Sequence, residues 1–240
     1  NNLILGKTNY YLLPFVNKIL LAPDSIRNFP EKYNKKIDRV GHIIREDILN
    51  YELHNKRKIN EKFSILVLGG SQGTEIFGTV IPETIKKIYN VGYNIKINHH
   101  CIKKHIQPLK NFYTENNIDS NVFEFTENIL KYILESDIVI SRCGASTTAE
   151  LIHTNTPFIA VPYPYASDNH QYLNAKYYEN KGYCWLLEQN NFNDETLFNL
   201  VIKILKDKNK LEIIKTNMKN DSFKFTNQKI EKTIRNLLQK

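Results

Sequence analysis

From Phe63 onward, short apolar runs alternate with longer segments that have helical character. The runs are expected to be strands, and they cover residues 63–68, 94–98, 122–125, 137–141, 157–161 and 183–187. Six strands that alternate with helices are typical of a doubly wound parallel sheet. The first run, F-S-I-L-V-L, is apolar throughout, as expected for a strand buried on both faces. We therefore predict an α/β fold for this part of the chain.

Helices are expected between these strands and after them. One follows the first strand and ends near Asn90, and others cover residues 103–115, 127–135, 146–154 and 169–180. Three closing helices, at residues 194–206, 210–219 and 228–238, carry apolar residues at three- to four-residue spacing.

The first sixty residues are less regular. A short helix capped by Thr8 or Asn9 is expected to reach about Asn17, followed by a strand at residues 18–22 and another at 37–44. The charged stretch 51–62 has the composition of a surface segment or an inter-domain linker, so we expect a domain boundary near it.

Two predicted strands run directly into glycine turns that open helices, at residues 69–73 and at Gly144. In open α/β sheets, ligands bind beyond the carboxyl ends of the strands, where helix N-termini favour an anion. Glu150, one turn into its helix, is placed to accept hydrogen bonds from sugar hydroxyls. The alternative is a plain strand-to-helix connection with Thr147 near the cap and Glu150 on a solvated face. Neither turn has the G-x-G-x-x-G or P-loop pattern, so the motifs support neither an NAD site nor an ATP site.

A third polar segment follows the strand at 157–161. A proline-containing loop leads to a helix that opens near Asp168, and four side chains crowd at its start: Asn169, His170, Gln171 and Asn174. Amide and imidazole groups are good partners for sugar hydroxyls and poor helix formers. Local capping accounts for Asp168 and Asn169 but leaves Gln171 and Asn174 unexplained.

Composition limits the remaining function classes. The formal net charge of +8 and the pI of about 9.2 suit an anionic partner, such as nucleotide phosphates or anionic lipid. The lysines are scattered, without a dense basic run, so we predict no nucleic-acid partner. No apolar run approaches the ~18 residues needed to span a bilayer, and no signal peptide is visible.

Cysteine and histidine usage indicates a protein without disulfides or metal. The three cysteines are odd in number and widely spaced, which argues against a disulfide framework and indicates a reducing cytosol. The cluster His99, His100, Cys101 and His105 invites a metal interpretation, but no second pair stands at ligand spacing. Without a G-x-S-x-G elbow there is also no support for a nucleophilic serine. We predict no cofactor and no metal.

Three motifs, L-V-L-G-G-S-Q-G, I-S-R-C-G-A-S-T-T-A-E-L and D-N-H-Q-Y-L-N-A, together resemble the MurG glycosyltransferases in order and spacing. The resemblance covers the chain from Asn2 to the last helix. It implies a GT-B fold, in which two Rossmann-like domains face each other across a cleft and the C-terminal one holds most of the donor. It further implies transfer of N-acetylglucosamine from UDP-GlcNAc to undecaprenyl-pyrophosphoryl-muramoyl-pentapeptide (lipid I), which completes lipid II for peptidoglycan. Such an enzyme associates peripherally with the cytoplasmic side of the bacterial plasma membrane.

The resemblance also implies how the chain is divided. Residues 1–45 correspond to the end of the N-terminal, acceptor-side domain and the hinge, and residues 46–62 to a linker. Residues 63–222 correspond to the donor-binding domain, and 223–240 to a closing helix. The family's catalytic base is expected in the part of the N-terminal domain that precedes this sequence, so no catalytic residue is assigned.

Donor-binding roles carry over motif by motif. Asn2 corresponds to the asparagine of the family's H-E-Q-N segment, and Arg45 to an arginine that contacts the donor. Ser71 corresponds to a serine that contacts phosphate, and it is flanked by Gly70 and Gln72. These correspondences imply that all five residues bind UDP-GlcNAc.

The later motifs complete the implied site. Thr126 stands in the uracil-recognising segment and departs from the family's residue there, although that contact is expected through the backbone. The diphosphate is expected at Ala145, Ser146 and Thr147, and the ribose hydroxyls at Glu150. The sugar is expected at His170 and Gln171, with support from Asn174.

Two other functions stay open. One is a donor-binding subunit that is inactive without a separate acceptor-domain partner, as in the two-chain dolichol-linked chitobiose synthase. The other is a UDP-GlcNAc 2-epimerase of related architecture. Epimerisation needs acid and base carboxylates around the sugar, and none occurs at the matching motif positions.

Overall fold

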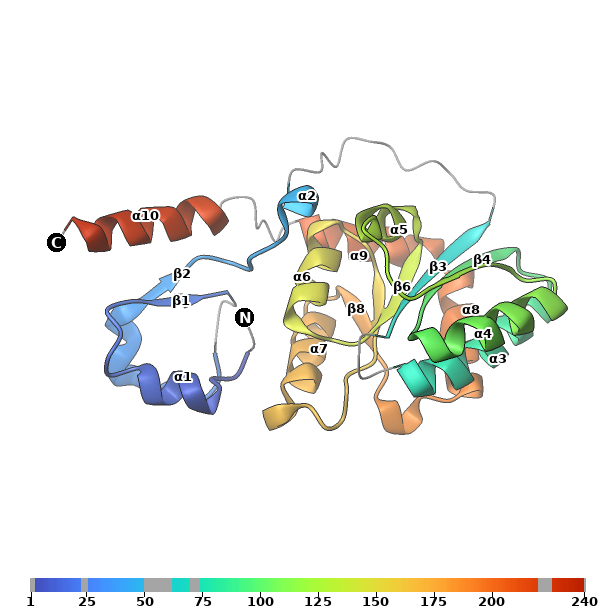
Figure 1. Cartoon of the computed structure of the whole chain (residues 1–240), viewed down its shortest axis with the longest axis horizontal. Coiled ribbons are helices and arrows are strands. Elements are labelled where there is room, and N and C mark those ends of the chain that lie inside the picture. The colour runs from blue at the N-terminus through green and yellow to red at the C-terminus, as the bar shows by residue number, and fades with distance from the viewer. Residues whose placement is uncertain (1–2, 23–25, 50–61, 70–73, 220–225, 240) are drawn as a thin grey trace.

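The computed structural model describes residues 3–22, 26–49, 62–69, 74–219 and 226–239, and its main body is a six-stranded parallel sheet (Figure 1). The strands are β3 (Phe63–Leu68), β4 (Ile95–His100), β5 (Asp119–Phe123), β6 (Ile138–Ser141), β7 (Phe158–Ala160) and β8 (Cys184–Leu186). Their order across the sheet is β5-β4-β3-β6-β7-β8, so the direction of winding reverses between β3 and β6. This order confirms the predicted doubly wound α/β fold.

Helices cover both faces of the sheet (Figure 1). One face packs against α3 (Thr74–Asn90), α4 (Lys103–Glu115) and α8 (Asp194–Lys206), and the other against α5 (Ile129–Glu135), α6 (Ala145–His153) and α7 (His170–Asn180). The helix α9 (Lys208–Lys219) contributes to both cores. Along β3, Ile65 and Val67 join the first core and Leu66 the second, and all three are fully buried. The alternation explains why this strand is apolar at every central position.

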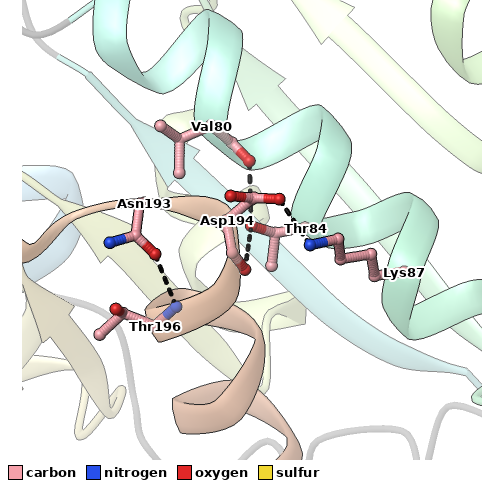
Figure 2. Close-up of polar contacts among 6 residues, drawn as sticks. All are labelled: Val80, Thr84, Lys87, Asn193, Asp194 and Thr196. Atoms are coloured by element: carbon pink, nitrogen blue, oxygen red, sulfur yellow. Dashed lines mark hydrogen bonds and ion pairs between the residues drawn. The ribbon is translucent and has the colours of Figure 1, made fainter.

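A hydrogen-bonded contact fixes α8 against α3, as Figure 2 shows. Thr84 Oγ1 lies 2.9 Å from the carbonyl oxygen of Val80 and 3.3 Å from that of Asp194. Lys87 Nζ lies 2.6 Å from Asp194 Oδ2. At the start of α8, Asn193 caps the helix by accepting a hydrogen bond from the backbone N–H of Thr196 at 2.9 Å. The contact braces α3, the helix that follows the glycine-rich turn after β3.

The N-terminal part forms a smaller unit beside the sheet (Figure 1). It contains α1 (Lys7–Leu12), β1 (Ile19–Leu21), a 3-10 helix (Glu31–Lys36), β2 (Ile37–Arg39) and α2 (Glu46–Leu49). The strands β1 and β2 pair in parallel with each other. The last helix, α10 (Thr226–Leu238), lies beside this unit, where Thr233 Oγ1 donates a hydrogen bond to Asp38 Oδ2 at 3.1 Å. Of the segment predicted as a linker, α2 is described, and its Ile48 is fully buried in the second core.

Three predicted boundaries in the chain were wrong. The first helix ends at Leu12 instead of near Asn17, because Pro14 lacks the N–H that a continuing helix needs. The strand predicted over 37–44 ends at Arg39, and Gly41, with φ of 93°, then turns the backbone away. The strand predicted over 122–125 instead begins at Asp119 and ends at Phe123. It is an edge strand whose first residues are polar, so the apolar pattern marked only its end.

Candidate functional site

The site is built where the winding of the sheet reverses. Leu68 at the end of β3 pairs with Ser141 at the end of β6, so the two strands end side by side. The backbone N–H of Arg142 also bonds to the carbonyl of Leu68 at 3.4 Å. Ligands of doubly wound sheets bind at such a reversal point. The predicted donor residues Asn2, Gly70, Ser71 and Gln72 lie outside the described residues.

The turn after β6 leads directly into the N-terminus of α6. Gly144 is its N-cap, with extended backbone, and no side chain among the described residues caps the helix. The N–H groups of Ala145, Ser146 and Thr147 have no acceptor within the helix, because the first turn of any α-helix lacks them. Ser146 is exposed and the other two are half-buried. This end therefore offers backbone donors and a positive dipole to an anion.

Glu150, one turn further along α6, is paired with Arg45 from the segment before α2. Arg45 Nε lies 3.0 Å from Glu150 Oε1, and the side chains are 47% and 16% exposed. The carboxylate is the more buried partner. Burial raises the pKa of Glu150, and the charge and hydrogen bond of Arg45 lower it by less. Two residues predicted to contact the donor, far apart in sequence, are thus in contact with each other.

A cavity of about 240 Å³ opens beside Glu150. It is lined by Leu68, His100, Phe123, Phe125, Thr126, Ile129, Arg142, Thr147 and Glu150. Thr126 Oγ1 already accepts a hydrogen bond from the N–H of Asn128 at 3.1 Å, so its side chain is engaged in a local turn. Aromatic and aliphatic walls suit a flat, weakly polar group such as a nucleobase. The cavity brings the predicted residues Thr126, Thr147 and Glu150 together.

The start of α7 carries the predicted sugar-binding residues. Asp168 and Asn169 adopt left-handed backbone conformations, with φ of 52° and 54°, so the chain turns sharply before the helix. His170 Nδ1 lies 2.8 Å from the carbonyl of Ser167, which makes Nδ1 the donor and leaves Nε2 without this contact. His170 lines a second cavity, of about 460 Å³, which it shares with residues of the N-terminal unit such as Asn9.

Gln171 and Asn174 are engaged with backbone. Gln171 Oε1 accepts hydrogen bonds from the N–H groups of Cys143, at 3.2 Å, and Tyr163, at 3.0 Å. Asn174 is only 2% exposed, and its Nδ2 donates to the carbonyl of Cys143 at 3.3 Å. Asn174 therefore lies beneath the turn that opens α6.

Arg142 is a residue of this site to which no role was assigned from the sequence, although it stands within the second motif. It directly follows β6, is 7% exposed, and lines the cavity beside Glu150. Its guanidinium donates hydrogen bonds to the carbonyls of Val161 and Pro162 and to Gln189 Oε1. Burial lowers the pKa of Arg142 to about 10, so the group is a cation at neutral pH. A basic residue between an apolar strand and a glycine turn was the signal available in the sequence.

The histidine cluster near β4 is organised differently from a metal site. His99 Nδ1 lies 2.9 Å from Tyr113 Oη in the core, and burial lowers the pKa of His99 to about 3. Within the described ranges, no group of three or more His, Cys, Asp or Glu side chains is arranged to hold a metal ion.

Residues 64–234 match the sequence profile of the glycosyltransferase family 28 C-terminal domain. The chain belongs to glycosyltransferase family 28. It is 33% identical over 225 residues to a protein of Pelagibacter ubique, covering 94% of this chain and 62% of that protein. A Rickettsia felis protein is 35% identical, covering 90% and 62%. Both relatives are named UDP-N-acetylglucosamine–N-acetylmuramyl-(pentapeptide) pyrophosphoryl-undecaprenol N-acetylglucosamine transferase.

Solved structures show the same fold. A crystal structure of Acinetobacter baumannii MurG superposes with a TM-score of 0.78 at 23% identity, covering 98% of this family 28 chain and 65% of that one. A UDP-N-acetylglucosamine 2-epimerase superposes with a TM-score of 0.55 at 10% identity, covering 89% and 54%. The resemblance to the MurG glycosyltransferases and the GT-B fold are thereby confirmed. The chain spans about 62% of the length of the two curated relatives.

The ion pair of this family 28 chain predicts two opposite shifts in the pKa of Glu150. Arg45→Ala removes a nearby positive charge and should raise that pKa further, whereas Asp47→Ala removes a negative charge and should lower it. Because the pKa is already raised on folding, ionisation of Glu150 costs stability as pH rises through it, and Arg45→Ala should enlarge this loss. NMR titration of the Glu150 side-chain carboxyl carbon measures both shifts. An unchanged or lower pKa in Arg45→Ala would contradict the pairing.

Proposed function

We propose that this chain carries the donor site of an inverting hexosyltransferase that moves N-acetylglucosamine from UDP-GlcNAc to lipid I. The product is lipid II, a precursor of peptidoglycan. The observation that carries the proposal is the order of three features in space: the open N-terminus of α6, the Glu150 carboxylate one turn along it, and the aromatic cavity beside that carboxylate. This order corresponds to the diphosphate, ribose and base of a nucleotide. The names of the relatives supply the substrates.

Each part of the donor has a proposed partner. The uracil occupies the 240 Å³ cavity near the backbone of Thr126, and the ribose hydroxyls donate to Glu150. The diphosphate lies against the N–H groups of residues 145–147, and Gly70, Ser71 and Gln72 are further proposed partners of the donor. The sugar reaches the start of α7, where His170 and Gln171 contact its hydroxyls. Asn174 supports this contact from below, and Asn2 completes the site from the N-terminal side.

Binding of the donor changes the partners of Arg45. In the structure its Nε lies 3.0 Å from Glu150 Oε1. Ribose hydroxyls that bond to Glu150 compete for this carboxylate, while the diphosphate offers Arg45 a bidentate anion. We therefore propose that Arg45 turns from Glu150 to the diphosphate.

The transfer needs a base for the acceptor hydroxyl and stabilisation of the departing UDP. A base takes the proton of the acceptor hydroxyl, whose oxygen forms a bond to the anomeric carbon as the bond from that carbon to the phosphate oxygen breaks. UDP leaves with the electron pair. The described residues serve this departure through the dipole and N–H groups of α6 and the cations Arg45 and Arg142. We assign the base and the lipid pyrophosphate site to a part of the family's architecture outside this chain.

The acceptor is a lipid, so we propose peripheral association with the cytoplasmic side of the bacterial plasma membrane. Tyr10, Tyr11, Leu12 and Phe15 of the N-terminal unit are 54%, 74%, 48% and 84% exposed. Lysines flank them in the sequence. Aromatic and apolar groups beside basic residues favour the interface of an anionic bilayer. In the part of the chain that the structure describes, no helix has the length and apolar character to cross a membrane.

Ligand selectivity tests the donor site. Calorimetric titration should show that the chain binds UDP and UDP-GlcNAc more tightly than ADP or NAD. Glu150→Ala removes charge-assisted hydrogen bonds, each worth about 1.5–3 kcal/mol, and should weaken UDP binding tenfold or more at a nearly unchanged melting temperature. Glu135→Ala, on exposed α5 surface, is the control for a lost carboxylate. ADP binding as tight as UDP binding would contradict the proposal.

Transfer to a lipid I analogue tests the rest of the function. The chain alone should not catalyse transfer, because an acceptor that is not held beside the donor loses a proximity effect worth ~7–11 kcal/mol of the barrier. Addition of an N-terminal segment that carries the family's catalytic base should restore transfer. Restoration in trans, by a separate chain, would favour the alternative of a donor-binding subunit. Turnover of this chain alone at the rate of a complete enzyme would refute the assignment of the base.

A further inference from the structure

The backbone of Cys143 is held on both of its polar groups by side chains from α7. Its N–H donates to Gln171 Oε1 at 3.2 Å, and its carbonyl accepts from Asn174 Nδ2 at 3.3 Å. Cys143 is fully buried and immediately precedes Gly144, the N-cap of α6. The two amides thus fix the last peptide groups before the helix begins.

Thr148 of α6 also contacts this turn: its Oγ1 donates a hydrogen bond to the carbonyl of Gly144 at 2.8 Å and lies 3.5 Å from Cys143 Sγ. An added Cβ at Gly144 would meet no atom within 4 Å, so the glycine faces open space. As noted above, no described side chain caps α6. The direction in which the first N–H groups of α6 point therefore depends in part on the two side chains from α7 that hold Cys143.

Gln171 is also bonded to a second segment. The same Oε1 accepts the N–H of Tyr163 at 3.0 Å, so one amide oxygen ties the turn after β6 to the loop after β7. With its oxygen committed to two backbone donors, Gln171 can face a ligand only with its Nε2 donor group. One residue thereby connects the proposed sugar contact with the proposed diphosphate contact.

We propose that Gln171 is a positioning residue for the diphosphate, in addition to its contact with the sugar, and that Asn174 assists it. This inference rests on the proposed function, since it concerns how the same site holds UDP. Its particular consequence is that loss of Gln171 weakens the binding of UDP, a ligand without any sugar for Gln171 to touch. A residue that contacts only the sugar has no such effect.

Hydrogen exchange in the unliganded chain tests the geometry directly. Gln171→Ala should speed exchange of the Cys143 and Tyr163 amides, because both lose their acceptor. Gln171→Glu keeps an oxygen in place and should preserve their protection. Unchanged exchange of both amides in Gln171→Ala would overturn the inference.

Calorimetry with three ligands tests the consequence. Gln171→Ala should weaken UDP binding about tenfold, an effect comparable to the loss of roughly one hydrogen bond. Uridine binding should change little, because uridine has no diphosphate. His170→Ala is the matched comparison: the neighbouring residue has no bond to Cys143, so it should weaken UDP-GlcNAc but leave UDP near the wild-type affinity.

A stability control separates positioning from general damage. Asn217 Nδ2 donates to the carbonyl of Gly182 at 3.3 Å, a comparable side-chain contact in a loop outside the site. Asn217→Ala should lower the melting temperature without changing the affinity for UDP, uridine or UDP-GlcNAc. If Gln171→Ala binds UDP like the wild type, the inference falls while the proposed function stands. If the wild-type chain itself fails to bind UDP, the proposed function and the inference fall together.

Discussion

The pairing of β3 with β6 fixes where the turns that follow both strands begin. Leu68 and Ser141 are paired, both strands end there, and the N–H of Arg142 continues the pairing by one residue. After β3 the chain continues into α3 on one face of the sheet, and after β6 it continues into α6 on the other face, so the two connections diverge at this point. The start of α6 is consequently held beside the end of β3. The proposed contacts with the donor all lie around this end of β3 and β6.

Positive charge is concentrated near the turn after β6. Three positive features lie near the turn after β6: the N-terminus of α6, the exposed guanidinium of Arg45 and the buried guanidinium of Arg142. Glu150 offsets Arg45 in the unliganded chain at 3.0 Å. Arg142 is buried and bonded to two carbonyl groups, whereas Arg45 is about half exposed and is the cation that we propose changes partners. A fixed cation and a movable one suit a ligand whose leaving group gains charge during reaction.

Elements with strong local sequence patterns could be predicted from the sequence. Features that depend on the position of a strand in the sheet or on tertiary contacts could not. Buried strands such as β3 and the periodic helix α8 have strong local patterns, so their positions were predicted closely. The edge strand β5 has polar residues because one side of it is unpaired, which hid its first half.

The roles of individual side chains depended on tertiary contacts. Gln171 was predicted as a sugar contact, yet its oxygen bonds to backbone groups 28 and 8 residues away, a partnership that no local pattern encodes. Arg142 was missed because, although it stands inside the second motif, no role was assigned to it there. The assignments at Gly70, Ser71 and Gln72 stay predictions, since these residues lie outside the described ranges.

A crystal structure of the chain with UDP tests the central claim most directly. We expect diphosphate oxygens within hydrogen-bonding distance of the N–H groups of residues 145–147, ribose hydroxyls on Glu150, and Arg45 released from that carboxylate. The base should occupy the cavity that Thr126 lines. A nucleotide bound instead in the larger cavity beside His170, with the Arg45–Glu150 pair intact, would contradict the account.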